Sequence, residues 1–395
     1  MNEQALTTTD PRGIDRALFI AVLLLVAFGV VMVYSASVVT ASRQIGDSTY
    51  FLGRQMIYAA IGLVGMLVAS RVDYRVYKRL VYPLLALSIL GVVVCLTPLG
   101  LTINGASRWI GLGPITVQPA EVLKVALVLW LSYSLAKKSR RIKSFSIGFL
   151  PHLLVPGFAI LLCLLQPDFG TSMMLALLTF ALLFVAGAKL GYIMGAAILA
   201  APVAYLLVAG SEYRLKRLMT FLDPLSTRFG DGYQLSQSLF GFASGGVTGV
   251  GLGDGLQKFL FLPEAHNDFI AAIIGEELGV VGIWVLIAVF AVVVYRGVAI
   301  AFRARDEFGT YVAFGLSALI GLQTLANLCV AMGLLPTKGL NLPFVSFGGS
   351  ALVITLFSVG VLLNISRAGP AAPAAETEKP AAGGNRRRSS AEGES

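Results

Sequence analysis

The sequence is poor in charged residues. Only 13% of the 395 residues are Asp, Glu, Lys or Arg, whereas an average soluble domain has roughly 25%. Hydrophobic residues make up 56% of the chain, and the mean hydropathy is +0.81. The composition therefore excludes a large soluble enzyme and predicts an integral membrane protein.

Cysteine and histidine are also scarce, with three and two residues. Cys95, Cys163 and Cys329 each lie in an apolar run, where a thiol behaves as a small hydrophobic group. We therefore expect neither a disulfide framework nor a metal cluster. His266 is interpreted as a loop residue rather than a metal ligand, because His152 falls near the other membrane face. The first apolar run is long enough to span, so no cleavable signal peptide is expected.

Long apolar runs dominate the sequence. Ten of them have about the 17–25 residues that a helix needs to cross the hydrocarbon core, and they fall near 17–36, 55–70, 80–97, 119–136, 148–165, 170–187, 190–209, 269–295, 309–333 and 344–366. We predict an all-α polytopic membrane protein of about ten transmembrane helices. Residues 1–16 form an N-terminal tail, 17–367 the membrane domain with one large extracytoplasmic loop at about 210–268, and 368–395 a disordered tail.

The basic residues are distributed unevenly between the two faces. If the N-terminus is cytoplasmic, 20 of the 30 Lys and Arg residues fall on the cytoplasmic side and 9 on the other. This bias predicts that both termini are cytoplasmic. The net charge of +9 then reports topology, and no nucleic-acid partner is expected.

Polar residues of the outer side come from several distant segments. Arg108 precedes a predicted helix that begins at Pro119, because proline suits the first helical turn. Glu121 and Lys124 are three residues apart and share one face of that helix. They form either an ion pair that packs two helices or a polar lining that faces a cavity. Asp168, between a proline and a glycine, is first of all a turn former.

The outer loop has three further features. Residues 213–217 place three cations near the membrane surface, where they can meet lipid phosphates. Residues 233–242 are typical of an amphipathic helix lying in the interface. The glycines between 245 and 255 lack the Gly-Lys-Ser/Thr sequence of a phosphate loop, so we interpret them as a flexible loop with an exposed backbone.

Asp268 stands at the start of the eighth predicted span. Ionisable groups so placed are costly and point to function. At about 100° per residue, Asp268, Gly275 and Gly279 lie on one line, which predicts a glycine-lined groove for a neighbouring helix or an acyl chain. Lys338 and the segment 343–350, with its proline and glycines, predict an irregular backbone that lines a cavity.

Together these motifs resemble the shape, elongation, division and sporulation (SEDS) family. The resemblance covers Ala17 to Arg367 and rests on Arg108-Trp109-Ile110, Gln118-Pro119-Ala120-Glu121, the segments 166–171, 262–270 and 275–279, and Pro343 to Ser350. Residues 263–266 and 232–238 are closer to the division branch of the family than to the elongation branch.

The resemblance implies a peptidoglycan glycosyltransferase that polymerises lipid II on the outer face of the bacterial inner membrane during division. Asp268 matches the essential acid of the family, the expected general base. The implied substrate-binding residues are Arg108, Gln118, Glu121, Lys124, Asp168, Lys338 and Ser346. A divalent cation, Mg²⁺ or Mn²⁺, is a candidate cofactor without an identified ligand set. The implied partners are a class B penicillin-binding protein, other divisome membrane proteins and membrane lipid.

Two other functions remain open at this point. A transporter or lipid II flippase would use buried Glu and Lys residues and broken helices, but it would need a polar path to the cytoplasmic side as well. A noncatalytic divisome scaffold would tolerate replacement of Asp268.

Overall fold

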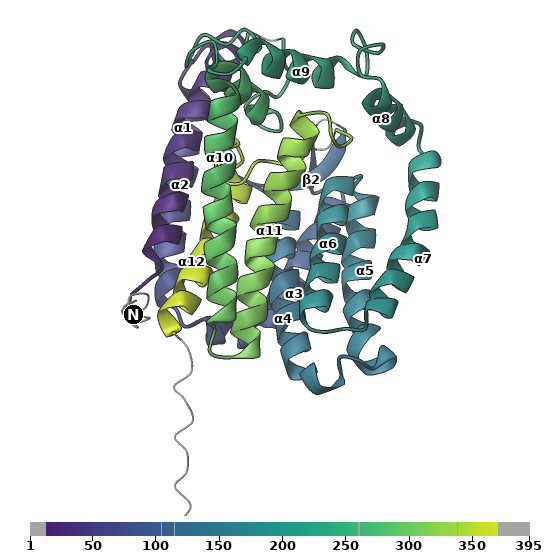
Figure 1. Ribbon diagram of the computed structural model, residues 1–395. Helices are drawn as coiled ribbons and strands as arrows, with labels where there is room; N and C mark the ends of the chain where they lie inside the picture. The colour runs from purple at the N-terminus through teal and green to yellow at the C-terminus, as the bar shows by residue number, and fades with distance from the viewer. Residues whose placement is uncertain (1–12, 104, 114, 260, 338, 370–395) are drawn as a thin grey trace, which may run out of the picture.

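The structure is a bundle of membrane-length helices (Figure 1). The computed structural model describes residues 13–103, 105–113, 115–259, 261–337 and 339–369. In this part of the chain, eight helical segments are long and apolar enough to cross a membrane, and two more apolar helices are shorter. They are α1 (Arg16–Gln44), α2 (Tyr50–Arg71), α3 (Tyr77–Cys95), α4 (Pro119–Lys137), α5 (Pro151–Leu165), α6 (Phe169–Val185), α7 (Leu190–Ala209), α10 (Ile270–Phe302), α11 (Glu307–Ala331) and α12 (Gly349–Ala368).

Each predicted span overlaps one of these helices, which confirms the polytopic helical fold. The tenth starts later than predicted, because residues 343–348 are irregular and α12 begins only at Gly349. The predicted tails fall largely on residues 1–12 and 370–395, which lie outside the described residues.

The helix α4 forms the centre of the bundle. All of its residues from Leu123 to Leu131 are buried, and a helix that is enclosed all round is a core helix. It packs against α3, α6, α11 and α12, while α2 packs along α12 and α1 along α10. The helix α7 lies at the edge (Figure 1).

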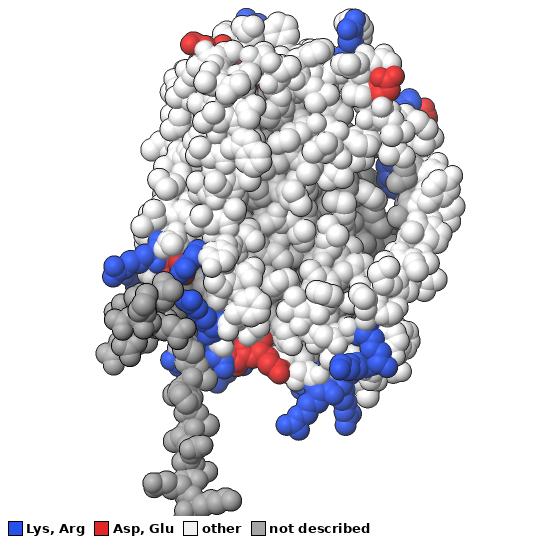
Figure 2. All heavy atoms as spheres, in the orientation of Figure 1, with Lys and Arg blue, Asp and Glu red and all other residues white. Residues whose placement is uncertain are grey.

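The described chain starts and finishes at one end of the bundle (Figure 1). The backbone N–H of Asp15 donates to Ser366 Oγ at 3.1 Å, and the Asp15 carboxylate pairs with Arg296. Most of the Lys and Arg residues visible in Figure 2 gather at this end. Both observations fit an even number of spans, with the basic residues concentrated at the end that carries both ends of the described chain.

The opposite end carries the shorter elements. These are α8 (Glu212–Leu222), α9 (Tyr233–Gly245), and an antiparallel sheet of β1 (Gly100–Ile103), β2 (Ala106–Leu112) and β3 (Ile115–Val117) in the order β1-β2-β3. Helix α9 confirms the helix predicted at 233–242. The sheet is absent from the all-α prediction, because its strands are short and lie between two spans, where hydropathy carries no strand signal.

The helix α10 is interrupted at Gly279, which has a φ of 66° and a ψ of −165°. The break exposes four backbone groups, and the segment 246–251 pairs with all of them: Val280 N–H to Gly246 O, Val281 N–H to Val247 O, Val250 N–H to Glu276 O and Gly251 N–H to Glu277 O, at 3.0–3.1 Å. The interpretation of this glycine-rich segment as a flexible loop was therefore wrong. Its backbone is docked on the broken helix.

The same packing corrects the predicted groove. Asp268 precedes α10, so it does not continue a helical line with the two glycines. A Cβ at Gly275 would lie 2.3 Å from the Phe242 ring, and one at Gly279 would lie 2.4 Å from Gly249 N. Helix α9 and the turn after it cover the glycine-lined surface. Of the two predicted occupants, the structure therefore has the neighbouring helix and not an acyl chain.

We expect Gly279→Ala to destabilise the protein by at least about 2 kcal/mol. The change places a Cβ against the docked backbone and imposes a left-handed conformation on alanine. Thermal unfolding in detergent measures the effect. The control is Gly65→Ala on α2, where a Cβ meets no atom within 4 Å and helix propensity favours alanine. Equal losses in the two variants would contradict the account.

Candidate functional site

The segment that carries Asp268 is fixed by two side chains from other parts of the chain. Asn327 of α11 donates through Nδ2 to the backbone oxygens of Asp268 at 2.9 Å and Leu340 at 2.6 Å. Ser346 donates through Oγ to the backbone oxygen of Asn267 at 2.6 Å. Asp268 is therefore held between α11 and the irregular segment that precedes α12.

The packing around His266 holds the same segment. Its ring lies 4.4 Å from Phe51 and 5.7 Å from Phe347, centroid to centroid, and its backbone oxygen accepts the Phe347 N–H at 2.9 Å. Glu264 and Phe344 have φ values of 53° and 65°, a costly conformation for residues other than glycine. His266 is therefore a loop residue, as predicted, and its ring packs against two phenylalanines.

Asp268 has an unusual electrostatic setting. Burial raises the pKa of its carboxyl to about 7, and the nearby Glu264 carboxylate acts in the same direction, whereas Arg217 and Arg108 oppose the rise. Asn327 donates to the backbone oxygen of Asp268 and not to its carboxylate, and the residue is half-buried. A carboxyl with this pKa can exchange a proton near neutral pH, which suits a general base.

Arg108 and Asp168 meet at the end of the bundle opposite the ends of the described chain. Arg108, on β2, donates through Nε to Gln166 O at 3.4 Å and through Nη2 to Pro167 O, and its Nη1 lies 4.0 Å from Asp168 Oδ1. The Asp168 carboxylate caps α6 by accepting the Thr171 N–H at 3.1 Å and its hydroxyl at 2.8 Å. Asp168, predicted as a turn former, is thus the N-cap of α6 and a neighbour of Arg108.

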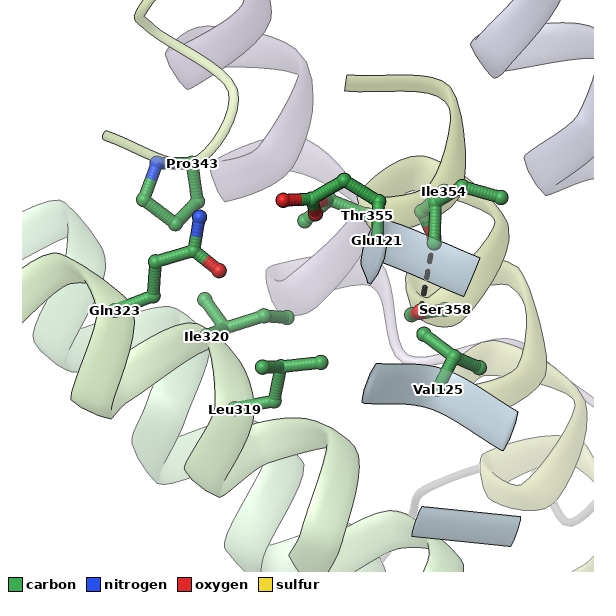
Figure 3. Close-up of a pocket in the computed structure, with 9 residues that line it drawn as sticks. All are labelled: Glu121, Val125, Leu319, Ile320, Gln323, Pro343, Ile354, Thr355 and Ser358. Atoms are coloured by element: carbon green, nitrogen blue, oxygen red, sulfur yellow. Dashed lines mark hydrogen bonds between the residues drawn. The ribbon is translucent and has the colours of Figure 1, made fainter. Parts of the chain in front are cut away.

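Glu121 and Lys124 form an ion pair, and Glu121 also lines a cavity. Lys124 Nζ lies 2.9 Å from Glu121 Oε1 and 3.1 Å from Gln323 Oε1, and its side chain is 1% exposed. Figure 3 shows Glu121 and Gln323 at a small cavity between α4, α11 and α12. About 10 Å³ is open to the centre of a water molecule there, roughly the room that one water needs.

The remaining predicted residues have different settings. Ser346 uses its hydroxyl within the chain, because it also accepts the Leu342 N–H at 2.8 Å. The backbone N–H of Gln118, just before α4, donates to Ser350 Oγ at 3.2 Å. Lys338 lies outside the described residues. Substrate binding by these three residues stays a prediction.

Sequence reasoning missed three residues of this region. Gln323 contacts Lys124, and Asn327 contacts Asp268. In the sequence, these are two amide residues one turn apart in an apolar run of α11, a pattern that could have indicated them. Lys258 pairs with Glu277 at 3.0 Å. Its signal was a lysine in the outer loop, against the charge bias, together with an acid inside an apolar span.

The fold and this arrangement define a class, a multi-pass membrane protein whose ionisable site lies near one membrane face. The chain belongs to the FtsW/RodA/SpoVE family of cell cycle proteins, whose profile matches residues 15–369.

Relatives and solved structures agree with this membership. The chain is 47% identical to a probable peptidoglycan glycosyltransferase FtsW of Trichlorobacter lovleyi, over 89% of this chain and 93% of that protein. It is 39% identical to the stage V sporulation protein E of Bacillus subtilis, over 91% and 99%. Its fold is similar to a chain of a peptidoglycan synthase complex (TM-score 0.76, 28% identity, 90% and 98% covered) and to RodA of Thermus thermophilus (TM-score 0.64, 26% identity, 90% and 97% covered).

We expect Lys124→Met to destabilise the protein by about 3–5 kcal/mol, because it leaves the buried Glu121 carboxylate without its cation. Adding Glu121→Gln should recover part of the loss. Thermal unfolding in detergent gives both values. The control, Lys216→Met, breaks the exposed Lys216–Glu212 pair of α8 and should cost less than about 1 kcal/mol. Equal stability of the Lys124 variant and the unmodified protein would contradict the prediction.

Proposed function

We propose that this protein is a peptidoglycan glycosyltransferase that joins lipid II molecules into glycan strands at the outer face of the inner membrane. The observation that carries the proposal is Asp268, a half-buried carboxyl with a pKa of about 7. Two relatives of high identity carry the name probable peptidoglycan glycosyltransferase FtsW, which supports the same chemistry.

Asp268 has a defined part in this reaction. Its carboxylate takes the proton of the acceptor hydroxyl as that oxygen bonds to the anomeric carbon of the donor sugar, and undecaprenyl pyrophosphate leaves with the electrons of the broken bond. A single displacement of this kind inverts the anomeric centre and needs no second carboxylate as nucleophile.

The cations of the outer end receive the leaving group. Arg108 and Arg217 lie close enough to Asp268 to lower its pKa, so they also lie near a pyrophosphate that departs beside it. Positive charge placed where negative charge develops stabilises the transition state. We assign the same role to Lys338. Glu121 and Lys124 would organise the polar groups at the cavity between α4, α11 and α12.

A divalent cation suits this site as an ion that is carried mainly by the substrate. The described residues contain no group of three or more His, Cys, Asp and Glu side chains placed to hold a metal. Mg²⁺ is often bound by one or two carboxylates together with substrate phosphates. The cation would neutralise charge on the pyrophosphate, and Asp268 would keep its role as the base.

Partner and location follow from the family. We propose a class B penicillin-binding protein as the partner, in line with the synthase complex to which the chain is similar. It would contact the outer faces of α10 and α11 and the 210–268 loop. Trp284 of α10, with 65% of its surface exposed, belongs to this surface. The termini would be cytoplasmic and the protein would act at the division septum with other divisome proteins.

We expect Asp268→Asn to reduce polymerisation of lipid II at least about 100-fold, because the amide cannot accept the proton. The assay uses purified full-length protein, alone and with its transpeptidase partner. The control is Asp231→Asn, an exposed carboxylate of the same outer loop, which should keep full activity. Undiminished polymer from the Asp268 variant would remove Asp268 from the mechanism, and translocation of lipid II without polymer would favour a flippase.

The pH dependence is a second prediction. A base works only when deprotonated, so kcat/KM should be constant above pH 7 and should fall about tenfold per unit below it. This fall on the acidic side of the pH profile, the acidic limb, reflects the raised pKa of Asp268, about 7. Initial rates of polymerisation between pH 5 and 9 measure it. A limb near the ordinary aspartate pKa of about 4 would contradict the assignment.

A further inference from the structure

A buried ionic cluster joins the two ends of the segment that carries Asp268. Lys258 Nζ lies 3.0 Å from Glu277 Oε1, and the two side chains are 4% and 0% exposed. Ser35 of α1 donates to the Glu277 carboxylate at 2.7 and 2.8 Å. Lys258 also donates to the backbone oxygen of Gly253.

The neighbouring acid holds the same turn by a different contact. The Glu276 carboxylate accepts the backbone N–H of Leu256 at 2.9 Å and of Gln257 at 3.1 Å, and its residue is 1% exposed. Two consecutive acids of α10 thus bind the turn at 253–258. Glu277 pairs with the Lys258 cation, and Glu276 accepts backbone N–H groups of the turn. The chemistry described above uses none of these groups.

The position of the cluster along the chain gives it a consequence. Lys258 lies about as far before Asp268 as Glu277 lies after it, so their contact closes a loop with Asp268 near its middle. The first part of α10, Ile270–Leu278, runs from Asp268 to the docked break at Gly279. A shift at the cluster would therefore move the carboxylate relative to Arg108.

A contribution to stability alone does not account for this design. Desolvation of two charges offsets much of their attraction, so well-packed apolar residues would serve as well. Ion pairs have a geometry that apolar contacts lack, because each partner must remain within hydrogen-bond distance of the other. The cluster connects α1, α10 and the outer loop, and α10 and this loop are the chain segments that flank Asp268.

We propose that Lys258, Glu277 and Ser35 are positioning residues that fix Asp268 for proton transfer. This inference rests on the proposed function. Within the part of the chain that the structure describes, the charged groups that act on Asp268 are Glu264 on its own loop, Arg217 of α8, Arg108 of β2 and Asp168 before α6. A loosened loop would change the distance of the Asp268 carboxylate from all four and from water.

The test compares Lys258→Met and Ser35→Ala with the unmodified protein. Lys258→Met should lower kcat for lipid II polymerisation roughly 100-fold at an unchanged KM, as expected for a misplaced catalytic group. The acidic limb of the pH profile should move to lower pH, because the released carboxyl gains water. Amide hydrogen exchange should increase across residues 259–268. Ser35→Ala keeps the charges paired and should show smaller changes in the same directions.

The control is Asp306→Asn, which breaks the Lys78–Asp306 pair at the inner end (2.7 Å) and should leave the pH limb and the exchange of 259–268 unchanged. The inference is overturned if kcat and the limb are unchanged in both variants. It is also overturned if Lys258→Met raises exchange evenly in all helices while the limb stays in place.

The two proposals fail in different ways. Full activity of Asp268→Asn would contradict the proposed function, whereas the exchange of 259–268 would still show whether the cluster holds the loop. An inactive Asp268 variant beside fully active Lys258 and Ser35 variants would contradict only the positioning role.

Discussion

The backbone of a membrane protein has no water to pair with, and this constraint shapes the outer half of the structure. Each unpaired N–H or C=O group within the bilayer costs several kcal/mol, so non-helical backbone persists there only where protein encloses it. The break at Gly279 satisfies this condition because residues 246–251 supply partners for the freed groups. The segment with Asp268 satisfies it through Asn327 and Ser346.

The enclosure that pairs the backbone also determines the chemistry of the carboxyl. The surrounding protein removes much of the water from Asp268, and loss of hydration disfavours the charged form, which raises the pKa to about 7. Arg108 and Arg217 limit the rise, and in the proposed reaction the same two cations would stabilise an anionic leaving group. One arrangement thus tunes the base and concentrates positive charge beside it, as expected where burial and charge partners are combined at a functional site.

Sequence reasoning predicted the spans well and the site in part. Hydropathy locates helices because each span must be apolar over its whole length, and ionisable residues in such runs marked Glu121, Lys124 and Asp268. The sheet at 100–117 and the docking of residues 246–251 have no such signal, since both depend on backbone pairing between distant segments. The contact of Lys258 with Glu277 was equally hidden, because helical periodicity describes one element and says nothing about which loop returns to it.

The packing beneath the site bears on whether a polar path continues inward. Below Lys124, α4 presents Val125 to Leu131 as an uninterrupted apolar and buried stretch. A Cβ at Gly315 of α11 would lie 2.6 Å from a Val128 methyl group and 3.3 Å from Leu182 of α6, so the three helices are in close contact at this level. A transported substrate would need polar groups or a hinge here. The closed apolar layer therefore favours chemistry at one membrane face over passage across the membrane.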